Sequence, residues 1–265
     1  MTARRAELAP KVAAFVQQIS EVANGEGLPR WQVPVCPLVA GLAREQGEFI
    51  LGRVSEIARE AGVPLAGEPC RPNLYILVTA HPQESLQELA KRNYSLMFLG
   101  DVSPRVVDEF IATPRAVRVW YSSYEKAPEG TALSGGPGPG ALLLGGSFGL
   151  SPKYNHWAQS SHLRSNVAWA FANVYVVVDL ARLQAVSRGQ LADYVGMVGL
   201  AQIKPDAHLG DAQTILRLFE GAPQSAPQGM SDWDRAFLKS LYATAQNSKV
   251  PRKEIARVMV REIAH

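Results

Sequence analysis

The pentapeptide Gly145–Gly149 (Gly-Gly-Ser-Phe-Gly) comes nearest to a catalytic motif in this sequence. Its G-x-S-x-G spacing is that of the nucleophile elbow of serine hydrolases, in which a strand leads to the serine and a helix follows directly. The apolar stretch Ala141–Leu144 would supply the strand, but Pro152 arrives five residues after Ser147 and interrupts a helix. We therefore expect a glycine-rich hairpin or lid here, with a serine hydrolase using Ser147 as the alternative.

The other chemically capable residues have spacings that fit no known type of site. Asp179 and His208 follow Ser147 in the chain order of a triad, but any chain of this length offers such a pair. His156 and His162 are six residues apart with no carboxylate between them, whereas neighbouring metal ligands on a helix need a spacing of three or four. The glycine-rich run at 135–140 lacks the lysine and hydroxyl of a phosphate-binding loop. We expect no metal and no cofactor.

The two cysteines, Cys36 and Cys70, lie 34 residues apart, and each stands close to proline in a predicted turn. They flank one predicted helix, and a disulfide between them would tie the start of that helix to the loop after it. Such a bond would indicate an oxidising compartment. The alternative is a pair of free buried thiols. No third ligand stands at zinc-site spacing.

Hydrophobic periodicity predicts the elements that must position these residues. The expected strands are Asn73–Thr79, Val117–Tyr121 and Asn173–Asp179. The expected helices are Lys11–Ser20, Val39–Ala61, Gln83–Arg92, Pro104–Ala112, Gly189–Ile203, Ala212–Phe219, Ser231–Ala245 and Pro251–Ile263. The order predicts an α+β fold: a small mixed sheet with helices packed on it and a helical C-terminal third. We expect one domain over 1–265, with a possible division into 1–124, a Gly/Pro loop at 125–149, and 150–265.

Charge and hydropathy exclude several classes of function. The net charge of +3 resides in Ser248–His265, and the rest of the chain is neutral, so a broad basic face for nucleic acid is not expected. The longest apolar runs, Val167–Ala172 and Val174–Val178, are far shorter than the ~20 residues of a membrane span. The first twenty residues contain no apolar core of a signal peptide.

The segment Asn173–Tyr242 resembles a family of exported bacterial proteins of unknown function with a zincin-like, metallopeptidase-like domain. In that family a His-Glu-x-x-His-x-x-Gly-Leu helix is followed by a Ser-Ile-Phe-type turn and a closing Leu-Thr-x-x-Asp-Arg-x-Leu-Leu-x-x-Leu-Tyr helix. This chain has Ala-Asp-Tyr-Val-Gly-Met-Val-Gly-Leu at 192–200, so Ala192 and Gly196 replace both zinc-binding histidines. The resemblance implies a zincin-like layout without its metal.

A binding cleft derived from that former active site would involve five residues: Asp193, Tyr194, Asp211, Trp233 and Asp234. The alternative is that Asp193 and Tyr194 only cap or flank a core helix. With no ligands for a metal, we expect no catalytic residue on this helix.

The whole chain is also similar to an uncharacterised proteobacterial family, through Val-Cys-Pro-Leu-Val-Ala-Gly-Leu at 35–42, Val-Arg-Val-Trp-Tyr at 117–121 and Leu-Ala-Asp-Tyr at 191–194. Members of that family tend to look exported, which favours the Cys36–Cys70 disulfide. The resemblance implies a periplasmic or secreted protein, with a cytoplasmic one as the alternative. The expected function is a non-catalytic domain that binds a protein or peptide, and a purely structural envelope protein is the other possibility.

Overall fold

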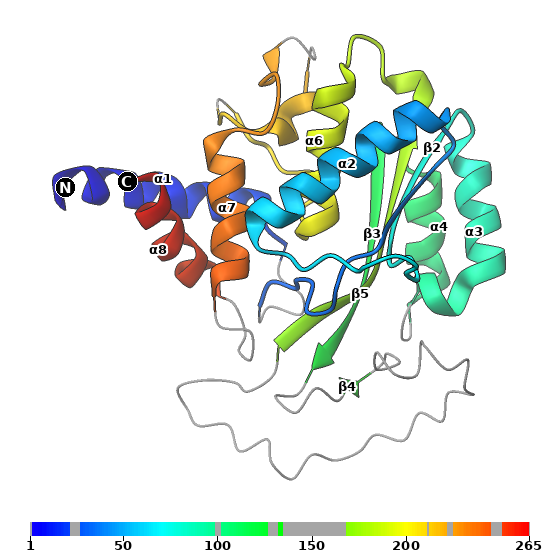
Figure 1. Cartoon of the computed structure of the whole chain (residues 1–265), viewed down its shortest axis with the longest axis horizontal. Helices are drawn as coiled ribbons and strands as arrows, with labels where there is room; N and C mark the ends of the chain where they lie inside the picture. Colours follow the sequence, from blue (N-terminus) through cyan, green and yellow to red (C-terminus); the bar gives the residue numbers. More distant parts are fainter. Residues whose placement is uncertain are drawn as a thin grey trace.

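The structure of the chain, a computed structural model, describes residues 2–21, 27–98, 102–126, 132–134, 168–210, 212–221, 225–244 and 251–264. Over these residues seven α-helices pack on a mixed β-sheet (Figure 1), which confirms the expected α+β class. In the same part of the chain, no helix has the length and apolar character needed to cross a membrane. The glycine-rich run at 135–140 and the candidate Ser147 lie outside the described residues, and the loop predicted at 125–149 is wrong in its first part, where residues 125–126 and 132–134 belong to strands.

Four strands form the body of the sheet, in the order β1 (Pro37–Ala40), β2 (Leu74–Thr79), β5 (Ala168–Asp179) and β3 (Val117–Lys126). β1, β2 and β5 are parallel, and β3 is antiparallel to β5. A short fifth strand, β4 (Ala132–Ser134), pairs with the last two residues of β3. The central β5 is covered on both faces, which explains why nearly all of its residues are buried.

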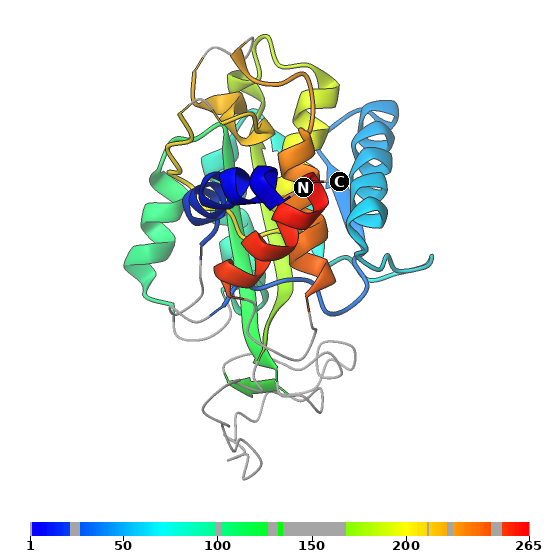
Figure 2. The same ribbon diagram turned by 90° about the vertical axis from the view of Figure 1, so that its left-hand side faces the viewer.

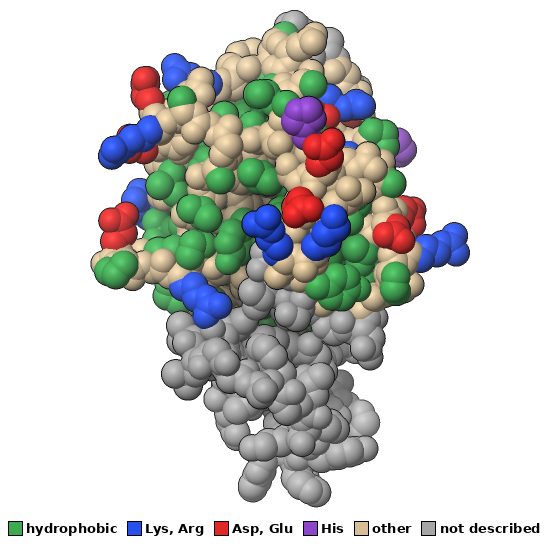
Figure 3. Space-filling view, turned by 90° about the vertical axis from the view of Figure 1, so that its right-hand side faces the viewer, with side chains coloured by type: hydrophobic (Ala, Val, Ile, Leu, Met, Phe, Trp, Pro, Cys, Tyr) green, Lys and Arg blue, Asp and Glu red, His purple; other side chains and the backbone are tan. Residues whose placement is uncertain are grey.

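Helices cover both faces of the sheet. One face is covered by α2 (Arg44–Ala61), α6 (Arg188–Leu200) and α7 (Asp232–Ala243). The N- and C-terminal helices, α1 (Thr2–Ile19) and α8 (Arg252–Ile263), pack side by side outside this layer (Figure 2). The opposite face is covered by α3 (Pro82–Met97) and α4 (Pro104–Ala112), and on that side of the molecule charges of both signs are scattered among hydrophobic side chains (Figure 3).

The alternation of β5 side chains determines which layer each contacts. Val174, Val176 and Val178 belong to the large core shared with α2 and α6, whereas Tyr175 and Val177 belong to the smaller core under α3 and α4. The sheet therefore separates two hydrophobic cores, and its edges are where the two layers approach each other.

The predicted helix start at Val39 is wrong. Residues 37–40 form β1, and α2 begins only at Arg44. The cause is Gly41, which has φ of +86°, and a Cβ at this position would lie 1.9 Å from the carbonyl oxygen of Val78. Only glycine allows the chain to turn this close to β2 before the helix begins.

Two other helix predictions needed correction. The segment predicted as a helix over Ala212–Phe219 is a 3₁₀-helix, η2 (Ile215–Phe219), capped by the Thr214 hydroxyl. The first helix begins at Thr2 rather than Lys11 and contains Pro10. The helix predicted over Pro104–Ala112 is present with those bounds. The other predicted helices and the three predicted strands are present with shifted ends, because pairing and packing extend or shorten them.

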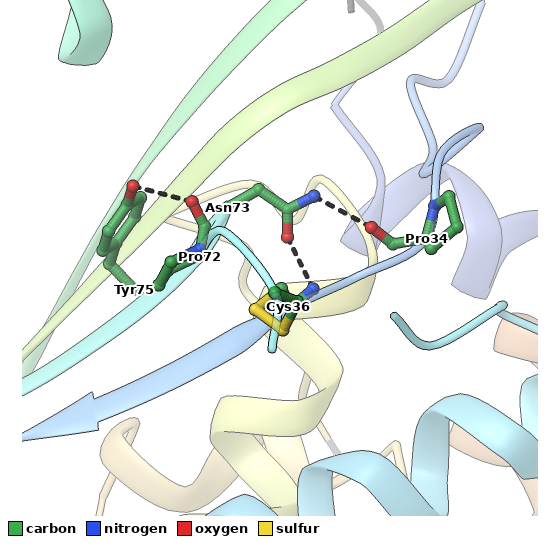
Figure 4. The surroundings of a disulfide bond; sticks show 6 residues. Pro34, Cys36, Pro72, Asn73 and Tyr75 are labelled. Carbon is green, nitrogen blue, oxygen red and sulfur yellow. Dashed lines mark hydrogen bonds between the residues drawn. A yellow bond between two sulfur atoms is a disulfide. The ribbon is translucent and has the colours of Figure 1, made fainter. Parts of the chain in front are cut away.

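Cys36 and Cys70 form a disulfide, so the alternative of two free thiols is wrong (Figure 4). The bond joins the residue before β1 to the loop before β2, with α2 lying between the two cysteines in sequence. Asn73 reinforces the same connection: its Oδ1 accepts from the Cys36 N–H at 2.8 Å, and its Nδ2 donates to the Pro34 carbonyl at 3.1 Å. This edge of the sheet is thus covalently fastened.

Candidate functional site

Asp193, the acid on the helix for which the sequence suggested a zincin-like layout, connects elements of the core. It lies on α6 and is 3% exposed. Its carboxylate accepts from Arg53 Nε at 2.5 Å and Nη2 at 3.2 Å, and from the Met230 N–H at 2.6 Å. These bonds hold α6 to α2 and to the start of the α7 segment. They also raise the pKa of Arg53, mainly through the hydrogen bond to Asp193.

Ala192 and Gly196, the positions at which the resemblance would place zinc-binding histidines, pack directly on the neighbouring elements. Ala192 is fully buried, and a Cβ at Gly196 would lie 2.6 Å from the Cδ1 of Ile57 on α2. A Cβ at Gly199 would lie 3.2 Å from a Leu74 methyl on β2. The small residues of α6 therefore serve close packing against α2 and the sheet.

Asp234 and Trp233 also have packing partners. Asp234 lies in the first turn of α7 and forms a capping box with Ser231, and it also accepts from the Thr214 hydroxyl and the Ile215 N–H. Burial raises the pKa of Asp234, and the hydrogen bonds that its carboxylate accepts from Thr214, Ile215 and Ser231 oppose that shift. Trp233 packs edge-on against Phe15 of α1, with ring centroids 5.3 Å apart. Both residues fix helices in place.

The hydrolase and metal candidates are placed only in part. Asp179 caps the short 3₁₀-helix η1 (Leu180–Arg182) and lies 3.3 Å from Arg182, and His208 is exposed. Asp211, Ser147, His156 and His162 lie outside the described residues. In the part of the chain that is described, no group of three or more His, Cys, Asp or Glu side chains is placed to hold a metal ion.

Tyr194, among the candidates that the structure describes, lines a cavity. It lines a hollow of about 340 Å³ that runs beside β3, which we call the β3-edge groove. α4 forms one wall through Val106 and Phe110, and the segment 203–206 after α6 forms the other. A second hollow, of about 570 Å³, adjoins it and shares Tyr194. Burial raises the pKa of Tyr194 to about 12.

The floor of the groove is the unpaired edge of β3. The Val174 N–H donates to the carbonyl of Asn73, the residue before β2. The backbone groups of Val174, Val176 and Val178 therefore face β2, and those of the residues between them face β3. In the β3–β5 register these valines lie opposite Tyr121, Val119 and Val117. The N–H and C=O groups of these three β3 residues therefore point away from β5. Among the described residues, no strand pairs with them on that side.

Hydrogen bonds from β3 and its lead-in hold the second wall in place. The Tyr121 hydroxyl donates to the Val198 carbonyl at 2.9 Å and accepts from the Ile203 N–H at 3.3 Å. Arg115 donates from Nη1 to the Pro205 carbonyl at 2.7 Å and pairs through Nη2 with Asp206. The groove thus has a fixed wall on the α6 side and an ion pair at one end.

Arg118 lies in the floor of the groove with part of its hydrogen-bonding capacity unused. It is 5% exposed, and its Nε donates to the Thr113 carbonyl at 2.6 Å. Its Nη1 is buried without a hydrogen-bond partner among the described residues. Burial lowers the pKa of Arg118, and Asp179 opposes that shift. An unsatisfied buried donor beside a cavity is uncommon in folded proteins and needs an explanation.

Sequence reasoning identified Tyr194 but missed the rest of this site. Arg118 stands in an apolar strand, Val-Arg-Val-Trp-Tyr, and this was the available signal that one strand position serves a purpose other than packing. The open edge itself has no sequence signal, because strand order is set by long-range pairing. Comparison with family models, with curated proteins and with solved structures finds no match for this chain.

Proposed function

We propose that this chain is a non-catalytic binding domain that takes up an extended segment of a partner protein or peptide along the open edge of β3. The observation that carries the proposal is the row of outward-facing backbone groups at Val117, Val119 and Tyr121 on the floor of the β3-edge groove. An unpaired strand edge binds an extended chain by main-chain hydrogen bonds, and side pockets supply the specificity.

The walls of the groove favour an added strand over a compact ligand. α4 on one side and the segment 203–206 on the other leave a channel in the plane of the sheet, where a next strand would lie. Apolar side chains of Phe110 and Ile203 line it together with charges of both signs from Arg115 and Glu109. Alternate side chains of a bound peptide would meet these two walls.

The proposed setting is the cell envelope or the exterior. The Cys36–Cys70 disulfide supports an oxidising compartment, because such bonds are rare in reducing ones. Derivation of the C-terminal third from a zincin-like scaffold stays a prediction, and the binding proposal does not depend on it. A serine hydrolase using Ser147 likewise stays a prediction.

The test begins with a peptide selected on the folded, oxidised protein from a phage-displayed library of random heptapeptides and then synthesised. In an added strand, alternate amides face β3 and the others face away. N-methylation of one alternating set should abolish binding, whereas methylation of the other set should change Kd by less than about threefold. Equal loss with both sets, or a selection that yields no peptide, would refute strand addition.

A change in the protein provides the matching test. Val119→Pro removes an N–H that points away from β5, so it removes a groove donor while the β3–β5 bonds remain. We expect it to abolish peptide binding measured by calorimetry. Val119→Thr keeps the N–H and should bind like the wild type. Thermal unfolding of both variants shows whether the fold is preserved.

A further inference from the structure

The two terminal helices form a second groove, with a lining different from that of the β3-edge groove. α1 and α8 pack side by side, and between them lies a hollow of about 510 Å³. Its floor is made of small apolar side chains: Ala6, Ala9, Ala13, Ala256 and Val260. Its rim is made of basic side chains: Arg5, Lys253, Arg257 and Arg261.

The helices leave this hollow because their larger apolar residues face the core. Val12, Phe15 and Val16 of α1 and Ile255 and Met259 of α8 are buried in the main hydrophobic core. The alanines of α1 recur at steps of three and four residues on a different, exposed face. The groove is therefore an apolar helix surface that nothing covers among the described residues.

The charge of the chain is concentrated around this groove. α1 contains three basic residues and one acidic residue, and α8 contains four basic and two acidic ones. Their combined charge of +4 exceeds the net charge of +3 of the whole chain. No acidic side chain lines the hollow itself. The nearby acids lie outside it: Glu7 pairs with Lys11 at 3.1 Å, and Glu254 lies 3.9 Å from Arg257.

The Arg5 side chain adds an independent sign that the rim is incomplete. Its Nε is buried and has no hydrogen-bond partner among the described residues. Arg252, by contrast, is the one basic residue of α8 outside the rim, and it donates to the Ser20 hydroxyl and carbonyl. The basic side chains of the rim thus surround the hollow, whereas Arg252 connects α8 to the residue after α1.

We propose that this groove, formed by α1 and α8, docks an amphipathic helix of a partner protein whose apolar stripe is flanked by Asp and Glu. Packed helices lie 8–10 Å apart, and alanines on the floor allow a third helix to approach that closely. The basic rim would meet carboxylates on both flanks of the stripe. A flat bilayer would reach the rim without filling the hollow, so a helix fits the groove better than a membrane.

The test uses two fluorescein-labelled helical peptides of 18 residues with the same Leu/Ala stripe, one with Glu and one with Lys on the flanking positions. Anisotropy titrations at low salt should give at least about tenfold tighter binding for the Glu peptide. The variant R257E/R261E should reverse this preference. Ala9→Phe, which fills the floor and keeps every charge, should weaken binding of the Glu peptide by at least about tenfold.

Three results would overturn the proposal. The first is equal binding of the two peptides, and the second is an Ala9→Phe variant that binds the Glu peptide as the wild type does. The third is binding to vesicles of phosphatidylglycerol and phosphatidylcholine without binding of either peptide, which would indicate a membrane surface. Thermal unfolding controls for folding, since all the altered side chains lie on the surface or at the groove. Val119→Pro should leave the titration unchanged, which separates this site from the β3-edge groove.

Discussion

Asp193 on α6 and Arg118 on β3 are both charged side chains inside the fold, and they are 3% and 5% exposed. The Asp193 carboxylate accepts hydrogen bonds from the Arg53 guanidinium and the Met230 N–H. We call this region, between α2 and α6, the closed region. Arg118 makes one bond to a carbonyl and leaves Nη1 unpartnered among the described residues, next to a cavity and an open strand edge. A satisfied buried charge marks a structural tie, whereas an unsatisfied one beside a cavity marks a candidate site.

The largest expected effect comes from restoring histidines to the closed region. The double variant A192H/G196H recreates the zinc-ligand spacing, but position 196 has no room even for a methyl group beside Ile57. We expect a loss of about 4 kcal/mol or more in the free energy of unfolding, measured in urea, because the helix must move off α2. Added zinc should not restore stability.

The matched control is another helical glycine. A Cβ at Gly52, on the exposed side of α2, would have no atom within 4 Å. Gly52→Ala should therefore stabilise the protein by up to about 1 kcal/mol. If A192H/G196H instead folded and bound one zinc ion, the closed region would be a cleft and the comparison would fail.

Removal of the Asp193 carboxylate is expected to have the next largest effect. Asp193→Ala leaves Arg53 and the Met230 N–H without their acceptor, which should lower the free energy of unfolding by about 3 kcal/mol. Glu56→Gln is the control, since Glu56 pairs with the same arginine from an exposed position and should cost less than about 0.5 kcal/mol. Similar losses in the two variants would show that Asp193 is no more than a surface partner.

Local sequence signals were sufficient for most helices and strands and insufficient for the contacts that bring these elements together. The apolar runs of β2, β3 and β5 and the helical periodicity of the α7 segment predicted the right elements, because each depends on neighbours along the chain. The resemblance drew attention to Asp193, but its burial depends on Arg53, 140 residues away. The β3 edge depends on which strand pairs with β5, and β1 depends on contact between Gly41 and Val78. Such long-range contacts cannot be derived from composition or periodicity.

Tyr194 lies at the boundary of the two regions and gives a pH-dependent test. Its folded pKa is raised to about 12 by burial, above the ordinary value of 10.0 for tyrosine. The unfolded chain therefore loses this proton first, and the contribution to stability is present below pH 10 and is lost as pH rises toward 12. Between pH 8 and pH 11, the free energy of unfolding of the wild type should fall by about 1 kcal/mol more than that of Tyr194→Phe. Urea unfolding at the two pH values measures this difference. An equal fall in the free energy of unfolding of the wild type and Tyr194→Phe would show that the Tyr194 hydroxyl is exposed to solvent.

The smallest expected change in stability most directly tests whether Arg118 holds the fold together or marks a binding site. Arg118→Met removes the Nε bond to Thr113 and at the same time removes an unsatisfied buried donor, so stability should change by less than about 1 kcal/mol. Arg30 is the matched buried arginine, and it donates to the Leu241 and Thr244 carbonyls at the end of α7. Arg30→Met should cost about 3 kcal/mol, because it removes buried hydrogen bonds to both carbonyls, and the Leu241 carbonyl keeps only the bond from the Thr244 hydroxyl. If Arg118→Met were equally costly, Arg118 would be a structural tie like Asp193, and the unsatisfied donor would cease to mark the groove.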